Sequence, residues 1–146
     1  MGRGRSSSIT SPGRSTSCPT VSGSSCSNQG AQDISRYHFV RDVERVEAVA
    51  RAQPTVRGYA LALTNDSSYW RVPTQPRPTI DAAFRLHEGS TLAGTLVWSA
   101  AAGAGTTRGR EKPHTLHGSH PLRWRDYSRV TDGPAGTFRY LLVEAG

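Results

Sequence analysis

Three histidines recur at intervals of three residues in the stretch HTLHGSH, at His114, His117 and His120. Three imidazoles can hold a zinc ion when a further ligand completes a tetrahedron. No cysteine or carboxylate stands in register with them, and Gly118 and Pro121 disfavour the helix that would bring the three onto one face. We therefore favour exposed loop histidines over a metal centre and keep these three residues as the candidate metal ligands.

The stretch LRWRDYSR interleaves aromatic and basic side chains: Arg123, Trp124, Arg125, Tyr127 and Arg129. Such interleaving is typical of surfaces that bind single-stranded nucleic acid, where bases stack on aromatic rings and cations contact the phosphates. The competing interpretation is an ordinary strand, in which Leu122 and Trp124 point into the core while Arg123 and Arg125 point to water. We favour the strand and keep nucleic-acid contact as an alternative.

Asn65 and Asp66 follow an apolar run, at the expected carboxyl end of a strand. Folds of the α/β class gather functional side chains at such ends. Asp66 could serve there as an acid or a metal ligand, or it could simply form a turn. Since no partner residue is evident, the turn is the favoured interpretation.

A helix at 33–52 is the clearest element that could position these residues. Its apolar stripe comprises Ile34, Tyr37, Val40, Val43, Val46, and Val49 or Ala50. Asp33 or Ser35 can cap its start, and Pro54 follows its end. Charged residues occupy the other face, where Glu47 and Arg51 are spaced for an i,i+4 pair.

A strand buried on both faces is expected next, at 58–66, because Tyr59 to Leu63 form a continuous apolar run. The other expected elements are a short helix at 79–89, a strand at 91–99, a loop at 103–121, and an antiparallel strand pair at 121–128 and 137–145. Together they predict a single small mixed-sheet domain of the α/β or α+β class.

The first 27 residues have the composition of a disordered leader, rich in serine and arginine and without any acid. The chain carries 18 basic and 11 acidic residues, a net charge of +7, which permits binding to DNA, RNA or another anionic surface. No apolar run is long enough for a secretory signal or a membrane span, so we expect no membrane association and a cytoplasmic location. The predicted organisation is a leader at 1–27 and one globular domain at 28–146.

Five stretches after the leader carry a resemblance: NQGAQDISRYHFVRDVERVE, GYALALTNDSSYW, DAAFRLHEG, GTTRGRE and LRWRDYS. Together they resemble an uncharacterised family of small proteins from high-GC bacteria with a fold like that of PD-(D/E)XK nucleases, over residues 28–146. The resemblance implies that an intact relative has a central β-hairpin whose Asp and Glu-x-Lys residues bind Mg²⁺ and activate water. That hairpin would precede Asn28, where this chain has a leader without Asp, Glu or Lys. No catalytic residue can therefore be carried over.

We hypothesise that the leader is a hairpin read in the wrong frame. Written with GC-rich codons and read from the third base, GRSTSCPTVSGSSCS becomes Pro-Leu-Asp-Val-Val-Pro-Asp-Gly-Glu-Arg-Phe-Glu-Leu-Leu. This reading gives two alternating strands around a Pro-Asp-Gly turn. It supplies no lysine two residues after the glutamate, which counts against the nuclease assignment. Loss of such a hairpin would leave the strand at 59–63 unpaired on one side and the domain incomplete.

Three functions follow as expectations. The first is a catalytically incompetent remnant of a nuclease-like domain, with Mg²⁺ used only by an intact relative. The second is a non-catalytic module that contacts nucleic acid through the basic surface around Arg123, Arg125 and Arg129. The third is an accessory protein that acts through protein–protein interaction.

Overall fold

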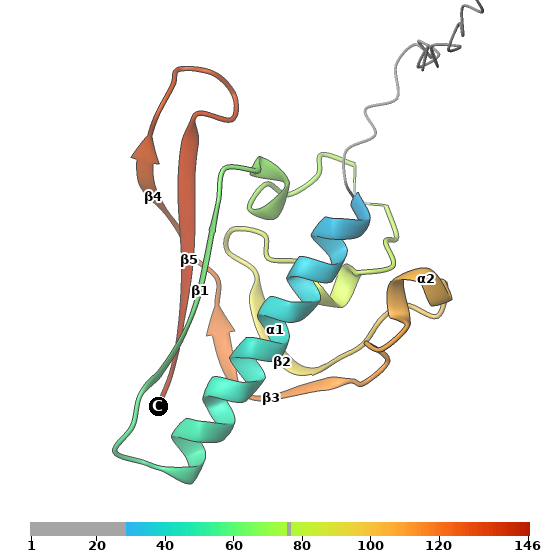
Figure 1. Ribbon diagram of the computed structural model, residues 1–146, viewed down its shortest axis with the longest axis vertical. Helices are drawn as coiled ribbons and strands as arrows, with labels where there is room; N and C mark the ends of the chain where they lie inside the picture. Colours follow the sequence, from blue (N-terminus) through green and yellow to red (C-terminus); the bar gives the residue numbers. More distant parts are fainter. Residues whose placement is uncertain (1–28, 76) are drawn as a thin grey trace, which may run out of the picture.

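The computed structural model of the protein describes residues 29–75 and 77–146 (Figure 1). One long helix, α1 (Gln29–Ala52), packs against strands of two antiparallel sheets. The prediction of a small domain with one long helix is confirmed. Because every strand pair in the described part is antiparallel, the domain belongs to the α+β class. The predicted leader at 1–27 lies outside the described residues.

The larger sheet has the strand order β1-β5-β4 and the smaller sheet consists of β2 and β3. The strands are β1 (Gly58–Thr64), β2 (Thr91–Leu96), β3 (His114–Pro121), β4 (Trp124–Arg129) and β5 (Thr137–Ala145). The short helices are η1 (Ser67–Tyr69), η2 (Ala82–Phe84) and α2 (Ala104–Thr107). The predicted antiparallel pair near the carboxyl end is therefore confirmed as β4 and β5.

The core lies between α1 and the two sheets. Its fully buried members include Val40, Val43, Phe84, Leu86, Leu122 and Leu141. Helix α1 lies so close to β1 that a Cβ atom added at Gly58 would stand 2.7 Å from Cβ of Val46. Glycine is required at this position by the close approach of the helix rather than by a turn. The helix therefore covers the inner face of β1 directly.

The caps predicted for this helix and the predicted position of Glu47 are wrong, whereas the open alternative at the end of its apolar stripe is decided in favour of Ala50. Because α1 begins at Gln29, Asp33 and Ser35 lie inside it and cap nothing at its start. Val49 is half exposed, whereas Ala50 is buried. Glu47 was expected on the solvated face, paired with Arg51. It is buried and forms a hydrogen bond with His120 instead. The helix has a polar contact with the smaller sheet that its apolar stripe does not reveal.

Two further segments differ from expectation. The helix predicted at 79–89 is only the single turn η2, and Asp81, directly before it, forms a buried ion pair with Arg36. The loop predicted at 103–121 contains α2 and the strand β3. In β3 the side chains of Leu116 and His120 are buried, which gives the segment a core face despite its polar composition.

The sequence predicted that strand β1 is buried on both faces, and this prediction is wrong. Ala60 faces α1 and is buried, whereas Tyr59, Leu61 and Leu63 are 52%, 64% and 52% exposed. Helix α1 covers only the inner face of the sheet, and no described segment covers the outer face. None of the helices in the described residues is both long and apolar enough for a membrane span.

Candidate interaction surface

Strand β1 forms one edge of the larger sheet. It pairs with β5 along its whole length, from Gly58 opposite Ala145 to Thr64 opposite Arg139. On its other side no strand of the described part pairs with it. An unpaired edge presents a row of backbone N–H and C=O groups to which another strand can bond. The sequence of β1, GYALALT, has no charge and no proline to block such pairing.

Most of the outer face of this sheet is apolar, although Glu144 lies on it opposite Tyr59 and Arg125 lies on it opposite Tyr140. By the outer face we mean its apolar residues: Tyr59, Leu61, Leu63, Tyr127, Tyr140 and Leu142. Four of these side chains, from β1, β4 and β5, together line a shallow hollow of about 390 Å³. Contiguous exposed apolar surface of this kind is uncommon on monomeric proteins and marks interaction sites.

A groove of about 390 Å³ runs between α1 and the free edge of β1. We call it the edge groove; it is lined by Phe39, Asp42, Arg45, Val46, Val49, Tyr59, Ala60 and Leu61. Val49 is 49% exposed here, although it belongs to the apolar side of the helix. A strand placed beside β1 would therefore meet apolar side chains on both of its faces: α1 on one side and the outer face on the other.

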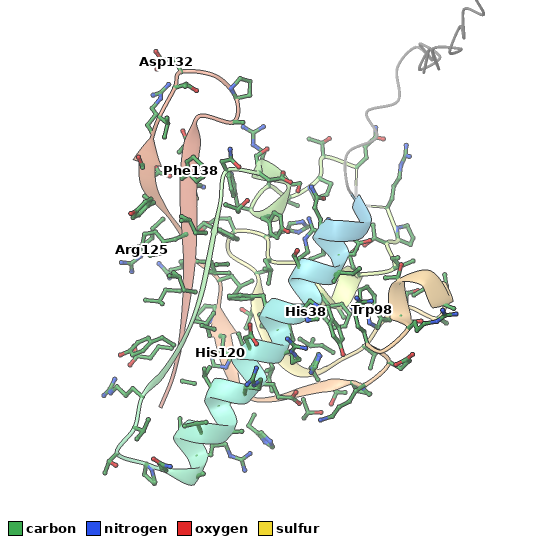
Figure 2. The ribbon with its side chains drawn as sticks, in the orientation of Figure 1. His38, Trp98, His120, Arg125, Asp132 and Phe138 are labelled. Carbon is green, nitrogen blue, oxygen red and sulfur yellow. The ribbon has the colours of Figure 1, made fainter. Side chains whose placement is uncertain are left out.

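The charges near β1 are largely paired with one another. Arg57 forms an exposed ion pair with Glu144 at the start of the strand, and Asp42 pairs with Arg45 at 3.6 Å on the rim of the groove. Arg125 is exposed on β4, on the side of the sheet away from α1 (Figure 2). We therefore expect binding at this surface to depend more on its apolar side chains than on positive charge.

The residues predicted to bind nucleic acid do not lie on one surface. Trp124 is 5% exposed and its indole N–H donates to the carbonyl of Leu86 at 2.7 Å, so it belongs to the core. Arg129 forms an exposed ion pair with Asp132. Arg123 and Arg125 are exposed, as the strand interpretation predicted. Of the five residues, Tyr127 is a member of the outer face, and Arg125 lies on the same side of the sheet.

The three histidines lie in strand β3, not in a loop. His117 is exposed, whereas His114 and His120 are buried. His114 Nδ1 lies 2.8 Å from a carboxylate oxygen of Glu44, and His120 Nε2 lies 2.6 Å from one of Glu47. Figure 2 shows His120 between the sheet and the helix. Within the described residues no group of three or more His, Cys, Asp or Glu side chains could hold a metal ion.

The two glutamates of α1 close the outer edge of β3. Glu44 accepts a hydrogen bond from the backbone N–H of Thr115, and Glu47 accepts from those of His117 and Gly118 at 2.9 and 2.8 Å. Burial would raise the pKa of the Glu47 carboxyl, but these bonds and that of His120 outweigh it and lower the pKa. The carboxylates thus take the place of a neighbouring strand. Helix α1 closes the edge of β3 and leaves that of β1 open.

The side chains of Asn65 and Asp66 form hydrogen bonds within the domain. The Asp66 carboxylate accepts from the backbone N–H of Ser68 at 2.9 Å and caps η1, and it also bonds to the side chain of Gln32. The side-chain amide of Asn65 donates to the carbonyl of Ala135 at 3.0 Å. The bond between Asp66 and Ser68 is that of a turn, which was the favoured interpretation of the sequence. The bonds to Gln32 and Ala135 are tertiary contacts between distant parts of the chain.

A buried ion group that the sequence interpretation missed lies at the first turns of α1. Arg36 donates a hydrogen bond to Asp81 at 2.8 Å with both side chains 1% exposed, and Arg85 forms an ion pair with the same carboxylate at 3.0 Å. Burial and the neighbouring Asp81 raise the pKa of Asp33 to about 6. Because two guanidinium groups occupy Asp81, this group does not fit a Mg²⁺ site. Two spacings in the sequence could have indicated these ion pairs: Asp33 and Arg36 are three residues apart, and Asp81 and Arg85 are four residues apart.

Comparison with known proteins identifies no relative: no protein-family model, curated protein or solved structure matches this chain. The nuclease-like relationship and the use of Mg²⁺ by an intact relative therefore stay predictions.

Proposed function

We propose that this protein is a non-catalytic protein-interaction domain that binds its partner by adding a strand to the edge of β1. The single observation that carries the proposal is that edge: it is unpaired within the described residues and flanked by apolar side chains on both faces. In strand addition, backbone hydrogen bonds supply affinity and alternating side chains supply specificity. The free edge and its flanking surfaces offer both.

The polar groups of the domain support a role without catalysis. Glu44 and Glu47 bond to β3, and Asp81 bonds to two arginines. These carboxylates hold elements of the fold together and leave little capacity for a substrate. The proposal therefore rests on a surface rather than on a reactive group.

Binding of single-stranded nucleic acid is a second candidate function. The observation that favours it is the exposed ring of Tyr127 near Arg125, on a protein with a net charge of +7. We rank it second because Trp124 is buried and Arg129 is paired with Asp132.

A labelled peptide with the sequence of residues 57–65, RGYALALTN, tests the proposal. It has the alternation of large and small apolar residues of β1 itself, so it can extend the sheet without a steric clash. We expect it to raise fluorescence anisotropy when it binds the full chain. Leu61→Lys places a charge on the edge strand and should weaken binding about tenfold or more, a loss of about 1.4 kcal/mol. Leu142→Lys is the matched control, since Leu142 is exposed on the same face but lies on β5. It should change the affinity less than about threefold.

Equal affinity of the wild type and Leu61→Lys would contradict strand addition at β1. A labelled single-stranded oligonucleotide serves as the second arm. Salt-sensitive binding of the oligonucleotide that Tyr127→Ala abolishes, with no binding of the peptide, would establish the second candidate in place of the first.

A further inference from the structure

We propose that the strand added to β1 is β1 of a second copy of this chain, so that the protein forms a twofold dimer with one continuous six-stranded sheet. This proposal rests on the strand-addition function and names its partner. The larger sheet has three strands, with β1 at one edge. Two such sheets joined at β1 have no unpaired edge at the junction.

The geometry of the strand fixes the register of the dimer. A twofold axis normal to the sheet keeps the outer faces of both copies on the same side, so facing residues must both be outer or both be inner residues. Strand β1 runs from Gly58 to Thr64, and its midpoint is Leu61. Centring the axis on Leu61 pairs the strand over its whole length. Leu61 of one copy then lies opposite Leu61 of the other, and Tyr59 lies opposite Leu63 of the other copy.

The pairs formed in this register are favourable on both faces. On the outer face, an aromatic residue meets a leucine at each end and two leucines meet at the centre, and such cross-strand pairs stabilise sheets. On the inner face, Ala60 meets Ala62 of the other copy, and both side chains are small. The two edge grooves then face each other, which brings the half-exposed Val49 of each copy toward an apolar surface.

The charges of the edge groove are self-complementary. Its rim holds one acid and one base, Asp42 and Arg45, so a twofold axis can set each Asp42 against Arg45 of the other copy. Like charges are not forced together on this rim. The repulsion that remains comes from the net charge of +7 on each chain, which salt screens.

The N-terminal part of the chain is a poorer occupant by sequence. Residues 1–28 contain Pro12 and Pro19 and no alternating apolar pattern. Proline removes a backbone donor, and a strand without apolar alternation cannot fill the groove and the outer face. A second β1 contains no proline and alternates large apolar residues on the outer face with alanines on the inner face.

Cysteine cross-linking in the full chain tests the register. In a Cys18→Ser, Cys26→Ser background, Leu61→Cys places two thiols at the twofold axis, within the reach of a disulfide. We expect most of the oxidised variant to run as a covalent dimer. Leu142→Cys is the matched control, because Leu142 and its copy would lie about three strand spacings, or about 14 Å, apart. A dimer formed by Leu142→Cys and not by Leu61→Cys would indicate face-to-face packing and overturn the proposal.

Sedimentation equilibrium tests the association itself. We expect the wild type to be in monomer–dimer equilibrium, Leu61→Lys to be monomeric, and Leu142→Lys to dimerise within about threefold of the wild type. Added salt should strengthen the dimer because it screens the net charge, which is opposite to its effect on nucleic-acid binding. A thermal melt of each variant shows whether the fold is intact.

The same measurements separate the two proposals. A wild type that stays monomeric but binds the 57–65 peptide through Leu61 would overturn the second copy as the occupant and leave strand addition standing. A wild type that stays monomeric and does not bind the peptide would overturn both. A dimer that survives Leu61→Lys would place the interface elsewhere and also overturn the proposal.

Discussion

Leu61 of β1 and Leu142 of β5 lie opposite each other on the outer face of the larger sheet, and they are 64% and 48% exposed. One position away, Ala60 and Val143 also lie opposite each other and are buried under α1. The same strand pair thus has one covered and one uncovered face. Full burial of a leucine side chain is worth about 1.5–3 kcal/mol, so Leu61, which lies on the edge strand, can contribute to binding when an added strand covers it.

The carboxylate of Glu47 is predicted to stabilise the fold through β3. Glu47→Gln replaces an acceptor of three hydrogen bonds by an amide that must turn an N–H toward at least one donor. We expect a loss of about 1–3 kcal/mol in the free energy of unfolding, measured by urea denaturation. The control is Asp132→Asn, whose side chain is 98% exposed and which should be close to neutral.

The effect of Glu47→Gln should also depend on pH. The pKa of Glu47 is lowered in the folded protein from its usual value of 4.5, so the carboxylate stabilises the fold above about pH 4.5. That contribution disappears as the pH falls through the lowered pKa. Equal stability of Glu47→Gln and the wild type at pH 7 would show that the edge of β3 does not need the carboxylate.

Gly118→Ala is predicted to disturb the same contact from the strand side. A Cβ atom at this position would stand 2.9 Å from a carboxylate oxygen of Glu47 and 3.0 Å from Nε2 of His120. One of these groups must move and weaken its hydrogen bonds, at a cost of about 1–3 kcal/mol. Gly105→Ala, where an added Cβ meets no atom within 4 Å, is the control for replacing a glycine by alanine. A Gly118→Ala protein as stable as that control would contradict the account of this edge.

Asp33 should oppose the fold at neutral pH. Its pKa is raised from 3.8 to about 6, so the folded protein holds this proton more tightly than the unfolded chain does. The resulting stability is present below about pH 3.8 and is lost as the pH rises through 6. Asp33→Asn should therefore raise the melting temperature by a few degrees at pH 7.5, about 1 kcal/mol, and by much less at pH 4. A gain that is equal at both pH values would contradict the shifted pKa of Asp33.

Asp81 is predicted to be far more sensitive than Asp33. Its carboxylate is the nearer of two that compensate Arg36, whose side chain is 1% exposed, and Asp81→Asn leaves that buried guanidinium with only Asp33, at 3.4 Å, as a charged partner. Breaking a buried ion pair by removal of one partner costs about 3–5 kcal/mol. Urea denaturation of Asp81→Asn measures the loss, and Asp132→Asn again serves as the exposed control. A loss below 1 kcal/mol, roughly the range of an exposed pair, would contradict the role of this contact.

Residues 29–146 should fold without the segment that precedes them. Within the described residues, the buried members of the hydrophobic core lie between Tyr37 and Val143, and the helix and both sheets fall inside residues 29–146. We expect a single cooperative thermal transition for a protein that begins at Gln29. A broad, non-cooperative transition would instead favour the prediction that the domain is incomplete.

The sequence predicted the long helix, β5 and the position of β1 well, because each has a strong apolar pattern. An unpaired side of β1 was expected only as a consequence of the lost-hairpin hypothesis. The continuous apolar run from Tyr59 to Leu63 does not itself predict a free edge, since it looks the same in a strand that is paired on both sides. A clue was present in residue size. The small residues Gly58, Ala60 and Ala62 face the helix, while the large residues between them face outward.

The contacts of β3 could not be predicted because they join residues about 70 positions apart. His114 and His120 are paired with Glu44 and Glu47 of α1, and neither segment alone indicates the other. The segment at 103–121 has the glycine, proline and histidine content of a loop. Its strand conformation depends on pairing with β2 and on the carboxylates of the helix, which are tertiary interactions.

Residue-resolved hydrogen exchange along β1 tests the central claim most directly, because it reports the backbone bonds themselves. The amides of β1 that point away from β5 should exchange fast in a dilute protein. With saturating 57–65 peptide, those amides should slow by about tenfold or more, which corresponds to about 1.4 kcal/mol of protection, while amides of β4 stay unchanged. Protection that appears on β4 alone, or peptide binding that leaves β1 unprotected, would contradict strand addition at this edge.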